Sequence, residues 1–294
     1  MLLSPLGLAS LMPDGEDSLG PWWLRQRIDK IGARLPGWKG KLLSTSGRET
    51  LVKTVLSAQP IYHMTAFLEM KWLVQKIDRI RRSFLWRGDT PDKVYGGHSL
   101  VNWPTTCRPK EKGGLGVLDL ERFSRALRLR WLWFKWKHKE RAWNCLDLPC
   151  NWRDRDLFAA STVVTIGDGK TANFWTSSWI DGTSLKGIAL NLFRKARRKK
   201  IMVWKAHQYN RWVAHILPLQ TVQELHEYAA LWEQEQKTTL EENSEDTIRW
   251  RWTANGEYTT KSAYNIHFEG SFSKLKLTPI RANSLHGHFC TRKF

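Results

Sequence analysis

The amino-acid sequence predicts an α+β protein, in which a basic helical module is followed by a mixed region with two β-hairpins. In the first half, apolar residues recur at spacings of three and four, the pattern of helices that bury one face. In the second half, β-branched and aromatic runs flank Asp168-Gly169 and Asn255-Gly256, dipeptides that favour tight hairpin turns. With 41% hydrophobic residues, the chain of 294 can bury a core.

The first half is predicted to form three helices before residue 90. They lie at residues 22–35, at residues 51–58 behind a capping box of Ser46 and Glu49, and from Trp72 to about Gly88. A loop is expected at 88–99, a strand or extended segment at 100–103, and a glycine turn at 113–116. Clustered glycines permit the positive φ angles that such turns use.

A fourth helix is predicted to begin at Asp119. Its apolar strip, expected to be core, is Leu120, Phe123, Leu127, Trp131 and Phe134. Leu129, Trp133 and Trp136 add a second apolar strip, and Arg122, Arg125 and Arg128 line the remaining side. This side is either a solvated flank or a face that contacts phosphates, because arginine supplies charge and bidentate geometry.

The second half is predicted to alternate strands and helices. Hairpins are expected at 162–175 and 247–260, an acidic helix at 222–235 behind a capping box of Thr221 and Glu224, and a helical turn at 261–268. The segment at 193–200 is a basic run, in which Arg194, Lys195, Arg197, Arg198, Lys199 and Lys200 are candidate nucleic-acid contacts. Such runs are nuclear-localisation patches, phosphate-contacting loops or solvated surface.

The formal charge of +19 is unevenly distributed. Residues 21–200 hold 36 Lys/Arg against 15 Asp/Glu, whereas residues 221–246 hold one Lys against eight acids. A local excess of this size attracts polyanions through counterion release. RNA or DNA, bound weakly and with little sequence preference, is therefore the expected partner, and a charge that serves only solubility is the alternative.

Membrane, secretory and metal-dependent classes are disfavoured. No apolar run approaches 18 residues, and the first residues lack the basic start of a signal peptide. The four cysteines follow no disulfide framework, so a nuclear or cytoplasmic location is expected. His286, His288 and Cys290 offer three ligands where a structural zinc site needs four. No metal or cofactor is predicted.

Five segments occur in a characteristic order between about residues 24 and 268. They are WKGKLLSTSGRETLVKTVL, IDRIRRSFLWRG, GGHSLVNWPTTCRPKEKGGLGVLDLERFSRALRLRWLW, TIGDGKTANFWTSSW and RWRWTANGEYTTKSAY. Together they resemble the region downstream of the polymerase core in plant LINE-type (non-LTR) retrotransposon polyproteins. From about Asp246 the chain resembles the opening of the reverse-transcriptase zinc-binding domain.

The resemblance suggests a division of the chain into five ranges. They are a flexible lead-in at 1–20, a basic helical module at 21–150 that resembles a thumb or connection, a mixed linker region at 151–245, a truncated start of the zinc-binding domain at 246–270, and a tail at 271–294 that departs from the family. The main change of sequence character falls near residues 145–155.

The resemblance also bears on activity. A reverse transcriptase of this family needs a Tyr-x-Asp-Asp turn whose carboxylates hold two metal ions, and this sequence contains no adjacent Asp pair. We therefore expect no enzyme activity, but a catalytically inactive C-terminal fragment of such a protein that retains nucleic-acid binding. We also expect that changing Arg122, Arg125 and Arg128 to Gln would leave the fold intact.

Three alternatives stay open at this point. The chain could be a decayed gene product without a selected role, or an interaction module whose acidic helix at 221–246 docks on the basic half or on a partner. A metal-dependent nuclease would need a cluster of carboxylates, for which Asp154, Asp156, Asp168 and Asp181 are the candidates. Turn and helix-start positions account for three of these four without catalysis.

Overall fold

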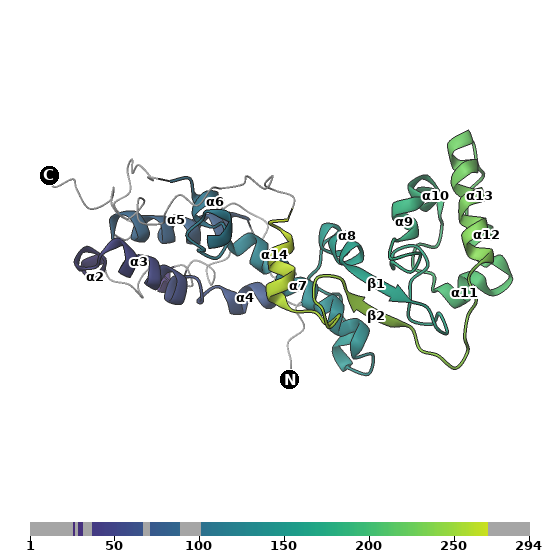
Figure 1. Ribbon diagram of the computed structural model, residues 1–294, viewed down its shortest axis with the longest axis horizontal. Coiled ribbons are helices and arrows are strands. Elements are labelled where there is room, and N and C mark those ends of the chain that lie inside the picture. The colour runs from purple at the N-terminus through teal and green to yellow at the C-terminus, as the bar shows by residue number, and fades with distance from the viewer. Residues whose placement is uncertain (1–25, 27–28, 32–36, 67–70, 89–100, 270–294) are drawn as a thin grey trace. The chain divides into compact units, whose positions relative to one another are not determined.

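The computed structural model describes residues 26, 29–31, 37–66, 71–88 and 101–269. Contacts group the chain into two compact units, Met1–Ser124 and Arg125–Phe294, and each unit is described by itself (Figure 1). The boundary between them falls inside a long helix, α7, at Leu120–Lys137. The five ranges suggested as domains stay a prediction.

The described part of unit 1 is helical. Its helices are α2 (Gly37–Leu42), α3 (Thr45–Leu51) with a π-helical continuation (Val52–Leu56), α4 (Ile61–Ala66), α5 (Lys71–Arg87) and α6 (Trp103–Thr106). The predicted helix from Trp72 to about Gly88 is confirmed as α5, which is followed by Gly88 with a φ of +74°. Of the predicted helix at 22–35, the described residues are helical.

Two local predictions in unit 1 are wrong. The cap of α3 is Ser44, whose Oγ accepts the Gly47 N–H at 3.2 Å, whereas Glu49 pairs with Lys53 one turn on. Trp103 was expected in an extended segment but begins α6, because the proline after it is well suited to a first helical turn. The turn at 113–116 is confirmed by positive φ at Gly113 and Gly116.

Unit 2 combines short helices with one two-stranded antiparallel sheet, so the α+β class is confirmed. Strands β1 (Thr162–Thr165) and β2 (Thr247–Trp250) pair with Thr162 opposite Trp250. After α7, the helices are α8 (Trp152–Ser161), α9 (Leu185–Ile188), α10 (Leu190–Lys195), α11 (Val203–His207), α12 (Arg211–Ala214), α13 (Val222–Gln236) and α14 (Thr260–Ile266).

Both predicted hairpins are wrong: each supplies one strand, and the two strands pair with each other across 80 residues of chain (Figure 1). A type I′ turn needs positive φ at both central residues. Gly169 and Gly256 have it, with φ of 69° and 71°, but Asp168 and Asn255 do not. The flanks of Asp168-Gly169 do not pair with each other. After β2 the chain does turn back, since Trp250 N–H donates to the Gly256 carbonyl at 2.7 Å, but no second strand follows in the described residues.

A buried carboxylate explains the path of the first failed hairpin. Asp246, just before β2, accepts the backbone N–H groups of Gly167 and Gly169 on one oxygen and those of Thr171 and Ala172 on the other, all at 2.8–2.9 Å. The loop at 167–172 wraps around this carboxylate instead of reversing into a second strand. The two carboxylate oxygens thereby accept four backbone N–H groups that would otherwise lack a partner away from water.

The core of unit 2 is aromatic. Trp175, Trp212 and Trp250 are each at most 2% exposed, and the Phe174 ring lies 5.1 Å from Trp175 and 6.0 Å from Trp212 between ring centroids. The predicted acidic helix, with its capping box of Thr221 and Glu224, is confirmed as α13, and the helical turn at 261–268 as α14.

In the described part of the chain, no helix has the length and apolarity needed to cross a membrane.

Candidate nucleic-acid interface

The three predicted contact arginines of α7 differ in burial: Arg128 is buried, and Arg122 and Arg125 are partly exposed. Arg128 is 3% exposed, and its Nε lies 2.9 Å from Oδ2 of Asp154, which is fully buried. Arg125 reaches the other oxygen of Asp154 at 3.3 Å, with 27% of its side chain exposed. Asp154 also closes a capping box with Asn151 at the start of α8. This pair of arginines fastens α7 to α8.

Arg122, Arg125 and Arg128 thus do not form one accessible face. Arg122 has 34% of its side chain exposed and lies 3.5 Å from Asp119. Removing the two cations beside Asp154 would strand a buried charge, which is strongly destabilising. The expectation that three Gln substitutions leave the fold intact is therefore not supported by this packing. The predicted role of these arginines in binding stays a prediction.

The apolar strip of α7 is only partly the predicted one. Leu120 and Leu127 are buried, as expected, but Phe123, Trp131 and Phe134 are half-buried. In the second predicted strip, Leu129 and Trp133 are buried and Trp136 is half-buried.

Of the six basic residues in the run at 193–200, Lys195 is partly buried and the other five are exposed. Lys195 Nζ lies 2.9 Å from the Pro218 carbonyl and 2.9 Å from Glu224 Oε2, so it joins α10 to the start of α13. That lysine and the Gln220 N–H hold the pKa of Glu224 at about 2, the Gln220 hydrogen bond having the larger effect. The exposed residues are Arg194, Arg197, Arg198, Lys199 and Lys200.

A cavity of about 270 Å³ opens beside this run, lined by Arg198, Ile201, Lys205, Arg211, Ala214 and His215. Backbone hydrogen bonds bring its two sides together, since Arg197 N–H donates to the His215 carbonyl at 2.8 Å and Leu217 N–H to the Lys195 carbonyl at 3.2 Å. We call these lining residues, with the exposed Arg197, the basic pocket. It gathers cations from the end of α10, from α11 and from α12.

The cations of the basic pocket have no acidic counterpart in the described ranges. Whereas Arg128 and Lys195 each meet a carboxylate, none of Arg198, Lys205 and Arg211 lies within 4.0 Å of one there. Partial burial and then the charges of Arg198, Arg197 and Arg211 lower the pKa of His215 below its ordinary 6.5. The cations thus add to the effect of burial in disfavouring a proton on His215, and an anion would relieve the part that is due to charge repulsion.

The acidic helix α13 docks within its own unit. Besides Glu224, its Glu227 accepts the backbone N–H groups of Asn191 and Leu192 at 3.0 and 3.1 Å at the start of α10, beside which α13 lies (Figure 1). Glu235 is 1% exposed and lies 2.6 Å from His207 Nδ1 of α11. Three of its carboxylates therefore hold the helices that form the basic pocket.

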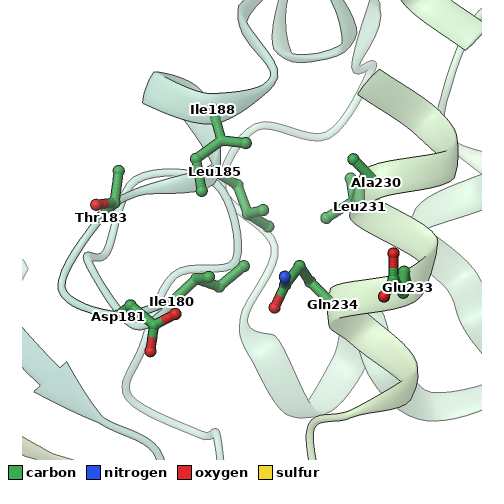
Figure 2. A pocket seen from close by; sticks show the side chains of 9 residues that line it. All are labelled: Ile180, Asp181, Thr183, Leu185, Ile188, Ala230, Leu231, Glu233 and Gln234. Atoms are coloured by element: carbon green, nitrogen blue, oxygen red, sulfur yellow. The ribbon is translucent and has the colours of Figure 1, made fainter. Parts of the chain in front are cut away.

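A second hollow, of about 290 Å³, lies between the turn at 180–188 and α13. Figure 2 shows Ile180, Leu185 and Leu231 directed toward its centre, together with the Gln234 amide. Its two carboxylates are Asp181, and Glu233, whose pKa is lowered by the hydrogen bond from Lys237. The hollow offers an apolar wall and no cation, so it does not suit a phosphate.

The four candidate nuclease carboxylates serve separate local contacts. Asp154 pairs with the α7 arginines, Asp156 with Lys186 at 2.5 Å, and Asp168 with Lys170 at 3.3 Å, while Asp181 has a φ of 47° in an exposed turn. Within the described ranges, no three His, Cys, Asp or Glu side chains lie together as a metal site would require. His286, His288 and Cys290 lie outside the described residues.

Sequence reasoning missed Lys205, Arg211 and His215. They stand singly in VWKAHQYNRWVAH, separated by residues other than Lys and Arg, so no charge run marks them. Only the fold of α11 and α12 against the run at 197–200 turns these isolated residues into a cluster.

Comparison with known proteins gives one informative match. The sequence is 27% identical over 271 residues to an Arabidopsis thaliana protein named "Putative ribonuclease H protein", and the match covers 81% of this chain. The chain spans 42% of that relative's length. No family model and no solved structure matches the sequence.

Proposed function

We propose that this protein binds nucleic acid weakly and electrostatically through the basic pocket of unit 2. The observation that carries the proposal is a cavity lined by Arg198, Lys205 and Arg211 with no carboxylate beside them in the described ranges. Unneutralised cations that converge on one cavity attract phosphates, and each contact releases counterions from the polyanion. The charge of +19 supplies the long-range attraction.

The descent that we propose for the chain agrees with this role. The ordered motifs between residues 24 and 268 resemble plant LINE-type retrotransposon proteins, and the Arabidopsis relative is named as a ribonuclease H protein. Both associations support a nucleic-acid partner and a retrotransposon origin. A place in the nucleus or cytoplasm fits such a partner.

We also propose that the chain does not polymerise nucleotides, because its sequence lacks an adjacent Asp pair. Primer extension with the purified protein and Mg²⁺ or Mn²⁺ should yield no product above a buffer control. Templated extension would contradict this part of the proposal.

The binding proposal is tested by the dependence of affinity on salt. Changing Arg198 and Arg211 together to Gln should reduce the slope of log K against log salt by roughly 1.4–1.8, because each lost phosphate contact removes about 0.7–0.9. Fluorescence anisotropy with a labelled oligonucleotide at several salt concentrations measures this slope.

The matched control changes Arg153 and Arg155 of α8, both exposed, to Gln. This variant loses the same net charge at another place and should keep the wild-type slope to within about 0.5. Equal slopes for the two double variants would show that net charge, and not the basic pocket, governs binding.

A further inference from the structure

The connection between α11 and α12 contains two consecutive residues in a strained backbone conformation. Tyr209 has a φ of 55° and Asn210 a φ of 51°. Residues with a side chain rarely adopt this left-handed region, and strain of this kind persists only where the surroundings enforce it. Tyr209 is also 87% exposed, the most exposed of the large apolar and aromatic side chains that the structure describes.

A buried carboxylate from α13 enforces this turn. Glu235 lies 2.6 Å from His207 Nδ1, and the Asn210 amide nitrogen, turned toward Glu235, donates to both carboxylate oxygens at 3.2 Å. The residues on both sides of Tyr209 are thereby fixed to the body of unit 2. The strained turn therefore holds an aromatic ring in solvent, where the ring is not stabilised by packing.

Tyr209 lies in the chain between two residues that line the basic pocket. Arg211, which lines the pocket, follows Tyr209 by two residues, and Lys205 precedes it by four. Because consecutive Cα atoms are 3.8 Å apart, the Cα atoms of Tyr209 and Arg211 are separated by at most about 7.6 Å. A ring and a cluster of cations this close can engage the base and the phosphate of the same stretch of nucleotide chain.

We propose that the site selects single-stranded nucleic acid, with a phosphate in the basic pocket and an unpaired base stacked on Tyr209. This inference rests on the proposed function and specifies its ligand. Every base has a face that can stack on an aromatic ring, so the contact tolerates any sequence. In a duplex both faces of each internal base are already covered, and the ring gains no partner.

The test compares a labelled single strand of twelve nucleotides, as RNA and as DNA, with a blunt duplex of the same sequence. Tyr209→Ala should weaken single-strand binding roughly 5- to 140-fold, which corresponds to the loss of about 1–3 kcal/mol from one stacked base. Duplex binding should stay within about twofold of wild type, and Tyr209→Phe should retain single-strand binding because it keeps the ring.

Tyr62→Ala in α4 is the matched control, since this tyrosine is 80% exposed but lies in unit 1. It should leave both affinities unchanged, and thermal unfolding should be alike for all variants. An equal loss on single strand and duplex, or no loss on either, would overturn the inference.

The outcome separates this inference from the proposed function. If Arg198→Gln with Arg211→Gln weakens binding to both ligands while Tyr209→Ala changes neither, the pocket binds nucleic acid without stacking. If the arginine variant changes neither ligand, the proposed function itself fails.

Discussion

The arginines of α7 and the cations of the basic pocket belong to the same residue class but meet opposite surroundings. Arg128 is buried against Asp154, with Arg125 on the second oxygen. Arg198, Lys205 and Arg211 converge on a cavity in which the described residues place no carboxylate. A run of arginines in a sequence therefore does not indicate a binding surface by itself. What distinguishes the two regions is whether the fold supplies an anion.

The largest expected effect concerns the interior pair. Arg128→Gln leaves Asp154 with only the partly exposed Arg125, and breaking a buried ion pair from one side costs about 3–5 kcal/mol. Urea denaturation should show this loss in the free energy of unfolding. The control, Arg141→Gln, removes an arginine whose side chain is 61% exposed and should change stability by no more than about 0.5 kcal/mol.

At temperatures where Arg128→Gln is folded, its binding should keep the wild-type salt slope. If the folded variant instead showed a smaller salt slope than wild type, Arg128 of α7 would contribute to nucleic-acid binding.

A second interior charge should give a smaller effect of the same kind. Asp246→Asn preserves shape but turns one acceptor oxygen into a donor that faces two backbone N–H groups of the loop at 167–172. Leaving such donors unsatisfied costs roughly 2–3 kcal/mol. Glu245→Gln is the adjacent control: its side chain is 83% exposed and pairs with Lys139 at 3.2 Å, so its loss should cost under about 1 kcal/mol. Similar unfolding midpoints for the two variants would remove the structural role assigned to Asp246.

The smallest effect is a pH dependence within the basic pocket. Folding lowers the pKa of His215, so the unfolded chain takes up this proton at higher pH than the folded chain. His215 therefore leaves the free energy of unfolding unchanged with pH above 6.5. As the pH falls through the window from 6.5 to the lowered pKa, His215 makes the folded state progressively less stable. The charges that act on the His215 ring are those of Arg198, Arg197 and Arg211, and Lys205 lines the same cavity.

A bound phosphate acts in the opposite direction, because it favours the protonated imidazole. Affinity for nucleic acid should therefore rise as the pH is lowered through that window at constant ionic strength, and His215→Gln should lose this part of the rise. If the affinity of wild type and variant depended on pH in the same way, His215 would have no role in binding.

The long, strongly patterned helices could be predicted from sequence. α5, α7 and α13 lie where spacing and end signals placed them, since Gly88 supplies a positive φ and Thr221 with Glu224 closes a capping box. These signals act over a few residues, within the reach of the backbone itself. The same holds for the glycine turn at 113–116.

The pairing of the two strands could not be predicted from the sequence. The runs at 162–165 and 247–250 are recognisable as strands, but they are joined through Asp246, which draws the loop at 167–172 around its carboxylate. A local hairpin rule cannot register an anion about 75 residues away in the sequence.

The helical periodicity, the strand-forming runs, the excess of positive charge and the order of the motifs can all be read from the sequence. Which of these charges are neutralised depends on the packing of the folded chain. It buried Arg128 on Asp154, engaged Lys195 with Glu224, and left Arg198 and Arg211 around an open cavity. The physical reason is that charge is a property of each residue, whereas neutralisation needs a partner at about 3 Å, and long-range packing alone sets that distance.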